Sequence, residues 1–385
     1  NALDCDDGSN LVRPGLADLS CDGVDVNCDG WDAPCGGPAC ATDPSFSWGT
    51  CTGAAGVHPR PVEVVAGAYH SCVRTEPTGD VWCWGLNNSL QCGSGSGPDP
   101  VPPVPRPTLQ TSVPNPGAVS ICAGDYYTCM ARGAAGLDCF GSFVGLTFVR
   151  RTANIVEVAC GINHVCYRTN MGRVDCVGLN GNGTIPTGQT GRALDAMPLY
   201  SDVAQTVIDS GAIEVAVGTN FSCARLSGGN IQCWGANDVG QLGRGGVAGT
   251  PLFTPSPANV AGPGVFTDLA TSQFGACGLV GTELRCWGNG PQGCVAGQPT
   301  TMGSAYPTPM VFADTPLSAL MRGFGSRFFA VGPDGLYAWG VDQTGVMARS
   351  PRGSAGRIDP NPSIALPRRG GVALSIRDLR KTLGE

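Results

Sequence analysis

Short apolar runs of strand length recur along the chain, and each is followed by two more strand-like runs around a glycine-containing turn. Runs of the first kind include VEVVAG (62–67), VEVACG (156–161) and IEVAVG (213–218). The two runs that follow each of them are typical of a β-hairpin. Six hairpin units of this kind occur, at residues 68–85, 125–141, 162–178, 221–235, 274–288 and 326–340. The pattern predicts an all-β protein made of repeated sheets of about four strands, the content of a propeller blade.

Cysteines occupy matching places in five of these hairpin units, one on each side of the turn. The pairs are Cys72/Cys83, Cys129/Cys139, Cys166/Cys176, Cys223/Cys233 and Cys277/Cys286. In the sixth unit Phe329 and Ala338 replace both cysteines together, which favours bonding within each unit. Facing residues of an antiparallel pair lie about 4.5–5.5 Å apart at Cα, within the range of a disulfide. We predict five hairpin disulfides, each stabilising by about 3 kcal/mol in the chain-entropy model; buried free thiols are the alternative.

Composition narrows the class of protein. The 385 residues include 59 Gly and 31 Pro but only 14% charged residues, which favours turns and short strands over long charged helices. The 20 Cys stand beside only three His, and no Cys-x-x-Cys spacing occurs, so disulfides are favoured over zinc or haem. No apolar run is long enough to span a membrane. We expect a protein of an oxidising compartment, secreted or at the cell surface, from which a signal peptide has been removed.

The net charge of −7 does not indicate a nucleic-acid partner. The charge is uneven, however, because residues 1–43 hold nine Asp against one Arg, whereas residues 349–385 hold eight Arg or Lys. If these ends faced different neighbours, a head-to-tail contact would follow, and such contacts can build open filaments. If they lie together in one molecule, they neutralise each other.

Two of the hairpin units carry a more specific pattern. They read VVAGAYHSC (64–72) with GDVWCWGLNN (79–88), and VAVGTNFSC (215–223) with GNIQCWGANDVGQLG (229–243). This pattern resembles the regulator of chromosome condensation repeat, best in the disulfide-bearing version found in secreted bacterial proteins. The resemblance covers residues 44–385 and implies a seven-bladed β-propeller. The second and sixth copies depart most from the pattern.

The seventh blade is expected to form from both ends of the chain. FSWG (46–49) resembles the tail of a repeat, and VALSIRDL (372–379) resembles the start of one. Joining them in one blade would close the ring.

The N-terminal segment 1–43 is acidic and rich in cysteine, and it resembles a metal-binding motif of secreted bacterial proteins. Asp25-x-Asn27-x-Asp29-Gly30 matches the first half of a calcium loop, although Gly36 stands where that loop carries its final Glu. Carboxylate and amide ligands favour a structural Ca²⁺ over copper or zinc. The expected ligands are Asp4, Asp6, Asp7, Asp22, Asp25, Asn27 and Asp29. A solvated acidic stalk tied only by disulfides is the alternative.

Further residues receive structural interpretations. We expect a set of tryptophans to pack between blades and a set of glycines to need positive φ or close approach. The tryptophans are Trp84, Trp234, Trp287 and Trp339, and the glycines are Gly67, Gly124, Gly161 and Gly218. His70 and His164 occupy matching positions where other copies carry different residues, so no shared metal or catalytic role is expected.

Some segments and cysteines are less well defined by the sequence. The proline-rich segment 98–116 is interpreted as an extended surface loop, and segment 191–211 as holding a short helix. Cys122 and Cys160 lie near the same strand position in successive copies, where a bond between them would link two blades. The remaining cysteines, among them Cys92, have no assigned partner.

These features favour a non-catalytic extracellular propeller that acts as a protein-binding or structural scaffold. The sequence has no nucleophile elbow, no phosphate loop, and no Cys/His pair that would remain once the cysteines are bonded, so an enzyme is not expected. Nucleotide exchange on a GTPase, the activity of the founding member of the repeat family, belongs to an intracellular setting. Two alternatives stay open: a subunit of a self-assembling filament or surface layer, and an inhibitor of a secreted hydrolase.

Overall fold

The structure of the protein is a computed structural model. It describes residues 60–93, 104–111, 117–143, 146–151, 153–195, 199–245, 251–262, 264–289, 305–312, 316–321, 327–333, 335–342 and 357–367.

The described residues form six sheets, each made of four strands that are consecutive in the chain and antiparallel. The first sheet contains β1 (Arg60–Ala66), β2 (His70–Glu76), β3 (Val81–Gly85) and β4 (Val104–Leu109). The second contains β5 (Ser120–Ala123), β6 (Tyr127–Ala131), β7 (Leu137–Phe143) and β8 (Leu146–Arg151). The third contains β9 (Ile155–Cys160), β10 (His164–Thr169), β11 (Val174–Leu179) and β12 (Tyr200–Ile208).

The other three sheets repeat this plan. The fourth contains β13 (Ala212–Val217), β14 (Phe221–Leu226), β15 (Ile231–Ala236) and β16 (Phe253–Asn259). The fifth contains β17 (Asp268–Thr271), β18 (Gly275–Val280), β19 (Glu283–Asn289) and β20 (Ala305–Phe312). The sixth contains β21 (Ala319–Met321), β22 (Arg327–Gly332), β23 (Gly335–Asp342) and β24 (Arg357–Pro367). The predicted hairpin units are therefore the second and third strands of each sheet.

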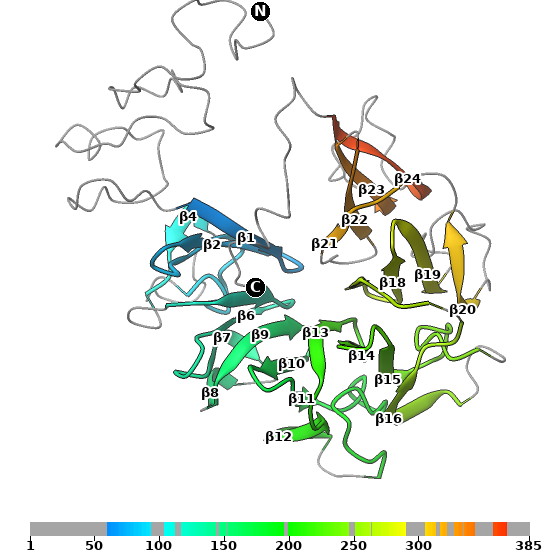
Figure 1. Cartoon of the computed structure of the whole chain (residues 1–385). Helices are drawn as coiled ribbons and strands as arrows, with labels where there is room; N and C mark the ends of the chain where they lie inside the picture. The colour runs from blue at the N-terminus through cyan, green and yellow to red at the C-terminus, as the bar shows by residue number, and fades with distance from the viewer. Residues whose placement is uncertain are drawn as a thin grey trace, which may run out of the picture.

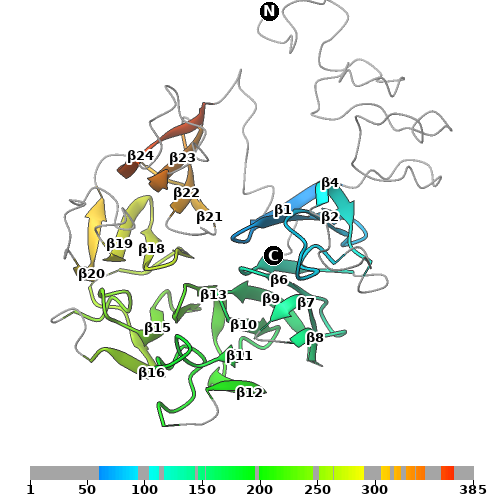
Figure 2. The same ribbon diagram turned by 180° about the vertical axis from the view of Figure 1, so that it is seen from behind.

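The six sheets follow one another around a common centre, from the blue first sheet to the orange sixth sheet (Figure 1). The first strand of each sheet contacts the first strand of the next, from β1 and β5 through to β17 and β21. These strands lie innermost, and fourth strands such as β12 and β16 lie at the periphery, as the view from behind also shows (Figure 2). Each sheet is thus one blade of a β-propeller.

The hydrophobic core lies between neighbouring blades. Five buried clusters lie at the boundaries between successive blades. Each contains the hairpin disulfide of one blade and a third-strand side chain of the next blade. That side chain comes directly after the position of the second hairpin cysteine. These side chains are Phe140, Val177, Trp234, Trp287 and Trp339, in blades two to six. Because a blade buries its faces only against its neighbours, stability depends on the contacts between successive blades.

Two predictions about the connecting segments were wrong. Within the segment interpreted as a surface loop, residues 104–109 form β4, since a fourth strand pairs on one side only and tolerates proline there. Within the segment interpreted as helical, residues 200–208 form β12, which pairs with β11. The β-branched residues of β12 fit a strand on an existing sheet edge, and that tertiary pairing overrides the local helical pattern.

The predicted seventh blade and the ring closure remain predictions, because residues 46–49 and 372–379 lie outside the described residues. The division of the chain at residue 43 lies outside them as well. The described part of the chain has no helix with the length and hydrophobicity needed to cross a bilayer.

Candidate binding face

The turns between the first and second strands of the blades, here called the inner turns, form the candidate binding face. Every blade repeats the same strand order from the inside outward, so the inner turns lie at one end of the blades, beside the centre. Neighbouring turns are bonded through their backbones: the Ala68 N–H donates to the Gly124 carbonyl at 3.3 Å, and the Thr219 N–H to the Gln273 carbonyl at 3.0 Å. The inner turns of the first and second blades, and those of the fourth and fifth, are therefore joined directly.

Close packing fixes the backbone of each inner turn. A Cβ on Gly67 would come within 2.2 Å of the Gly124 carbonyl oxygen of the next blade. The four predicted glycines are needed for close approach, and none of them has positive φ. Positive φ is found instead at the glycine after the third-strand Trp: Gly85 has φ of 112°, and a Cβ there would lie 2.6 Å from the Tyr69 carbonyl oxygen.

An exposed aromatic pair crosses the first two inner turns. The rings of Tyr69 and Tyr126 have their centroids 5.3 Å apart and are tilted by 33°. Tyr69 is 55% exposed and Tyr126 is 38% exposed. A side-chain hydrogen bond with Tyr69 raises the pKa of Tyr126, and burial raises the pKa of the neighbouring Asp125. The corresponding positions of the next three blades carry the half-buried residues Asn163, Asn220 and Phe274.

Buried histidines lie directly beneath the inner turns and bond one blade to the next. His70 Nε2 lies 2.7 Å from Thr128 Oγ1, and His164 Nε2 lies 3.0 Å from Ser222 Oγ. Because the Thr128 hydroxyl already donates to the Gln91 carbonyl at 2.8 Å, His70 donates through Nε2. Burial lowers the pKa of His70 to about 4 and that of His164 to about 3. Both rings are neutral near neutral pH and join blades.

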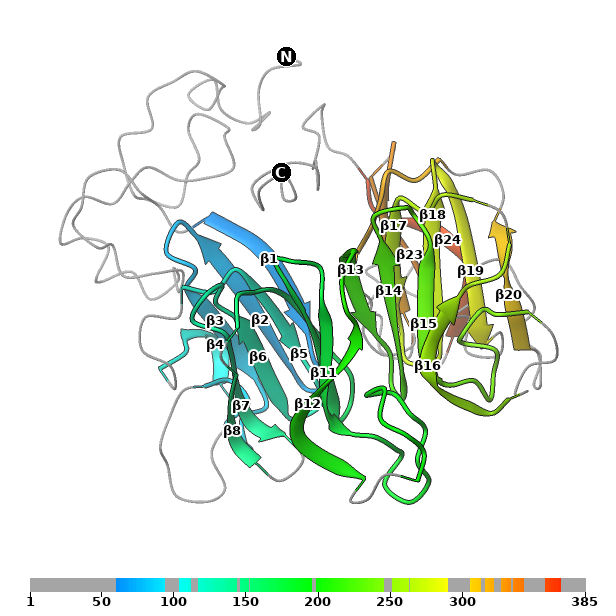
Figure 3. The same cartoon turned by 60° about the horizontal axis from the view of Figure 1, so that its bottom comes forward.

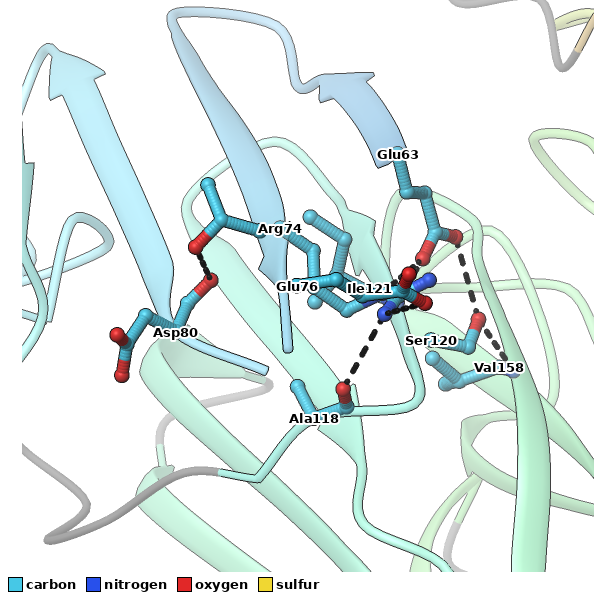
Figure 4. A network of polar contacts seen from close by, with 9 residues as sticks. Glu63, Arg74, Glu76, Asp80, Ala118, Ser120, Ile121 and Val158 are labelled. Carbon is cyan, nitrogen blue, oxygen red and sulfur yellow. Dashed lines mark hydrogen bonds and ion pairs between the residues drawn. The ribbon is translucent and has the colours of Figure 1, made fainter. Parts of the chain in front are cut away.

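A repeated acidic side chain joins the inner strands below the turns. Glu63 on β1 accepts a hydrogen bond from Arg74 Nε at 3.0 Å and reaches the next blade, where it accepts from the Ile121 N–H at 3.1 Å (Figure 4). Ser120 Oγ donates to Glu63 at 3.3 Å, and the Val158 N–H of the third blade donates to Ser120 at 3.5 Å. This network therefore connects three blades.

The same contact recurs farther around the arc. Glu157 accepts from Arg168 Nε at 2.7 Å and from the Val215 N–H of the next blade at 3.4 Å. Asp268 accepts from the Leu320 N–H of the sixth blade at 2.7 Å. Buried backbone donors are costly without a partner, so this position holds successive inner strands in register. The inner turns thus sit on a rigid support.

Comparison with known proteins agrees with this architecture. One family model described as the regulator of chromosome condensation (RCC1) repeat matches residues 62–91, 155–184 and 212–241. A second model of the same description matches residues 78–131. RCC1 repeats are thus matched in the first four of the six described blades.

Solved structures of other proteins show the same fold. Yeast RCC1 (Prp20), solved bound to Kap60, is 18% identical with a TM-score of 0.65, over 78% of this chain and 74% of that one. Human WBSCR16 is also 18% identical with a TM-score of 0.65, over 81% of this chain and 83% of that one. A second structure of Prp20p from Saccharomyces cerevisiae, whose description names binding to Gsp1p and histones, is 19% identical with a TM-score of 0.64 over 78% and 76%.

The propeller is bonded at all five of the cysteine pairs named from the sequence. In each pair the two cysteines face each other on the second and third strands, as Cys223 and Cys233 do. The bonds are Cys72–Cys83, Cys129–Cys139, Cys166–Cys176, Cys223–Cys233 and Cys277–Cys286. A sixth bond, Cys122–Cys160, joins the second blade to the third with a Cα separation of 5.4 Å.

The remaining predicted residues have different outcomes. The seven predicted metal ligands between Asp4 and Asp29 lie outside the described residues, so the calcium site stays a prediction. Three of the four tryptophans are buried between blades; Trp234 and Trp287 donate through Nε1 to the carbonyls of Gln189 and Gln241 in the preceding blade, at 2.9 and 3.0 Å. Trp84, in the first described blade, is half-buried.

Burial raises the pKa of the free thiol Cys92 to about 12, so this cysteine stays protonated.

The sequence analysis did not identify Tyr69, Tyr126 or the acidic inner-strand position. Aligning the copies on their glycine would have placed both tyrosines at one position, with Asn163 and Asn220 as the equivalents. It would also have aligned Glu63 with Glu157. Their exposure or cross-blade contacts depend on how blades are stacked, which the local pattern of one copy does not contain.

Proposed function

We propose that this propeller is a non-catalytic protein-binding scaffold, and that its partner docks on the inner turns over Tyr69 and Tyr126. The observation that carries the proposal is the exposed aromatic pair on a rigid support. Aromatic side chains supply large contact areas at low entropic cost and are enriched among the residues that dominate binding energy. Yeast RCC1, a relative in fold, was solved in complex with the protein Kap60, which supports a protein as the kind of ligand.

Site-specific crosslinking tests this proposal. A photo-crosslinking amino acid replaces Tyr69 or Tyr126 in the full chain, and the purified protein is illuminated in an extract of its native source. We expect both positions to capture the same protein, and unlabelled wild-type chain but not Tyr69→Ala/Tyr126→Ala to compete for it. Met171, which is 76% exposed in the turn between β10 and β11, provides the control position. The same adducts at Met171, or none at either tyrosine, would contradict the proposal.

The proposed location is outside the cytoplasm, in a secreted or surface-attached form. Six disulfides within the described residues support it, because cytosolic thiols are kept reduced. Alkylation of the protein under denaturing conditions, directly from its native source, measures the fraction of each cysteine that is free. We expect the twelve bonded cysteines to resist alkylation until a reductant is added. Extensive labelling without reductant would place the protein in a reducing compartment.

We further propose a structural Ca²⁺ in the acidic segment 1–43, on the strength of the Asp25-x-Asn27-x-Asp29 spacing alone. Calorimetric titration of the chelator-treated full chain with Ca²⁺ tests this. We expect saturable binding that Asp25→Ala/Asp29→Ala abolishes, with Asp209→Ala, an exposed residue of the propeller, as the control. An unchanged titration in the double variant would remove the proposal.

A further inference from the structure

The outermost strand of five blades contains the same irregularity. In each of these blades, one residue of the third strand faces three residues of the fourth strand. In the first blade, Trp84 faces residues 105–107. Residues 255–257, 307–309 and 360–362 lie in the same way against Trp234, Trp287 and Trp339. In the third blade, residues 202–204 lie against Val177. The three-residue bulge is therefore a repeated feature of the outer strands.

Four of these five bulges have proline at both ends and one has none. The four read Pro105-Arg-Pro107, Pro255-Ser-Pro257, Pro307-Thr-Pro309 and Pro360-Asn-Pro362. Proline has no N–H to offer a neighbouring strand, and it is one of the devices that keep exposed sheet edges from pairing with other chains. The bulge of β12 reads Asp202-Val203-Ala204. Among these five outer-strand bulges, this one alone has no proline and keeps all its amide donors.

The edge of β12 is exposed and weakly guarded. Val203 is 71% exposed, and Asp202, Gln205 and Thr206 are also exposed. Among the described residues, the side chains that hydrogen-bond to its backbone belong to the strand itself: Ser201 Oγ accepts from the Val203 N–H at 3.1 Å, and Gln205 Nε2 donates to the Thr206 carbonyl at 3.0 Å. These contacts involve flexible surface side chains that an incoming strand can displace. The strand lies on the outside of the molecule, away from the inner turns (Figure 3).

We propose that β12 pairs with β12 of a second copy of this chain, antiparallel and about a two-fold axis through Ala204. Asp202 is the single charged residue of the strand, so the main obstacle to self-pairing would be two Asp202 carboxylates in contact. The proposed register avoids this contact, because Asp202 lies opposite Thr206 of the other copy and Val203 lies opposite Gln205. The strand is therefore complementary to itself, and two-fold pairs are the commonest form of self-association.

The neighbouring blade does not offer an equivalent edge. Its outer strand β8 is also free of proline but ends in Arg150-Arg151, and charge on an edge strand discourages pairing. Pairing through β12 alone uses the same patch on both molecules and closes on itself. It therefore gives a dimer of propellers and leaves the inner turns of both copies free, so this inference does not depend on the proposed binding face.

To test this proposal, prolines are introduced into β12 at the two bulge positions that carry proline in four other outer strands. Sedimentation equilibrium of the full chain, over a range of concentrations, measures self-association of the wild type and of Asp202→Pro/Ala204→Pro. The bulge positions already hold proline in four blades, so the fold tolerates the change. We expect a reversible dimer for the wild type and at least a tenfold weaker association for the variant. Val203→Lys, which adds an edge charge without altering the backbone, is expected to have the same effect.

A reciprocal variant provides the matched control. Pro255→Asp/Pro257→Ala gives the fourth blade the bulge ends of the third and is expected to add association beyond the dimer. Hydrogen exchange then locates the contact: amides of residues 201–207 should exchange more slowly at concentrations that favour the dimer. A wild type that stays monomeric at every concentration, or a dimer that both β12 variants leave unchanged, overturns the proposal.

Discussion

At the residue scale, buried polar side chains in this propeller act across the boundary between blades. His70, Tyr127 and Glu63 come from different strand positions, yet each donates or accepts a hydrogen bond in the following blade. A buried polar group is costly when it loses its partner, so these contacts select one stacking of the blades. They give the buried histidines a structural role.

The neutral histidines predict a pH-dependent stability. Burial lowers the pKa of His70 to about 4 and of His164 to about 3, so between these values and about 6.5 only the unfolded chain gains the protons. The free energy of unfolding should therefore fall as the pH is lowered from about 6.5, by about 1.4 kcal/mol per pH unit for each histidine. Denaturant unfolding of His70→Phe/His164→Phe, which copies the buried Phe221 of the fourth blade, should show a flatter dependence. Parallel pH profiles for variant and wild type would contradict this assignment.

The acidic inner-strand position predicts a second effect of a single residue. Glu157→Gln keeps the size of the side chain but weakens its bonds to Arg168 and to the Val215 N–H, and should lower the free energy of unfolding by about 1.5–3 kcal/mol. Glu283→Gln is the matched control, because Glu283 pairs with Arg285 on its own strand. We expect that control to stay within about 0.5 kcal/mol of the wild type. Equal effects of the two changes would mean that the cross-blade bond contributes nothing.

At the element scale, the loop after the third strand of one blade and the aromatic residue of the next form a unit. Trp234 and Trp287 donate to the loops that carry Gln189 and Gln241 in the preceding blades. In the second blade β7 ends at Phe143 and β8 begins at Leu146, so no such loop is available to the third blade. There Val177 replaces the tryptophan, and the disulfide Cys122–Cys160 crosses the same boundary. We infer that the disulfide compensates for the missing loop contact.

Among the six described disulfides, this compensation makes Cys122–Cys160 the bond whose loss should be most costly. Its sequence separation of 38, against 9 to 11 for the hairpin bonds, corresponds to about 4 kcal/mol in the chain-entropy model, compared with about 3 kcal/mol for a hairpin. Cys122→Ala/Cys160→Ala should lower the free energy of unfolding more than Cys277→Ala/Cys286→Ala does. Hydrogen exchange should then show faster opening of β5 and β9 before the other inner strands. A smaller effect than that of the hairpin pair would show that the boundary is held by other contacts.

The repeat pattern predicted the hairpins well because a hairpin is a local structure. Two runs flanking a glycine turn determine their own pairing, and a cysteine pair that is lost jointly marks which residues face each other. The positions of the fourth strands were not predicted, because four of these strands carry prolines that are typical of loops and because each pairs with an edge supplied from elsewhere. For the same reason the bulge of β12 became visible only when its register could be compared with those of the other outer strands.

At the scale of the whole molecule, each blade is stabilised by its neighbours, so the ends of the arc differ from its interior. Val64 on β1 is 63% exposed, whereas Ile121, Val158 and Val215, which hold the same register position in the next three blades, are fully buried. Each of those residues packs toward the blade before it. Within the described residues, β1 has no blade before it. The burial of the Val64 side chain therefore indicates whether the ring is closed.

We expect the two ends of the chain to complete a seventh blade against β1 and to bury Val64. Under closure, Val64→Ala removes methyl groups from a core and should lower the free energy of unfolding by about 2 kcal/mol, as Val215→Ala should in the interior of the arc. Removing residues 372–385 should then eliminate the effect of Val64→Ala but leave that of Val215→Ala, which a double-mutant cycle measures. If Val64→Ala costs nothing in the full chain while Val215→Ala is destabilising, the propeller is open at β1 and the closure predicted from the sequence is wrong.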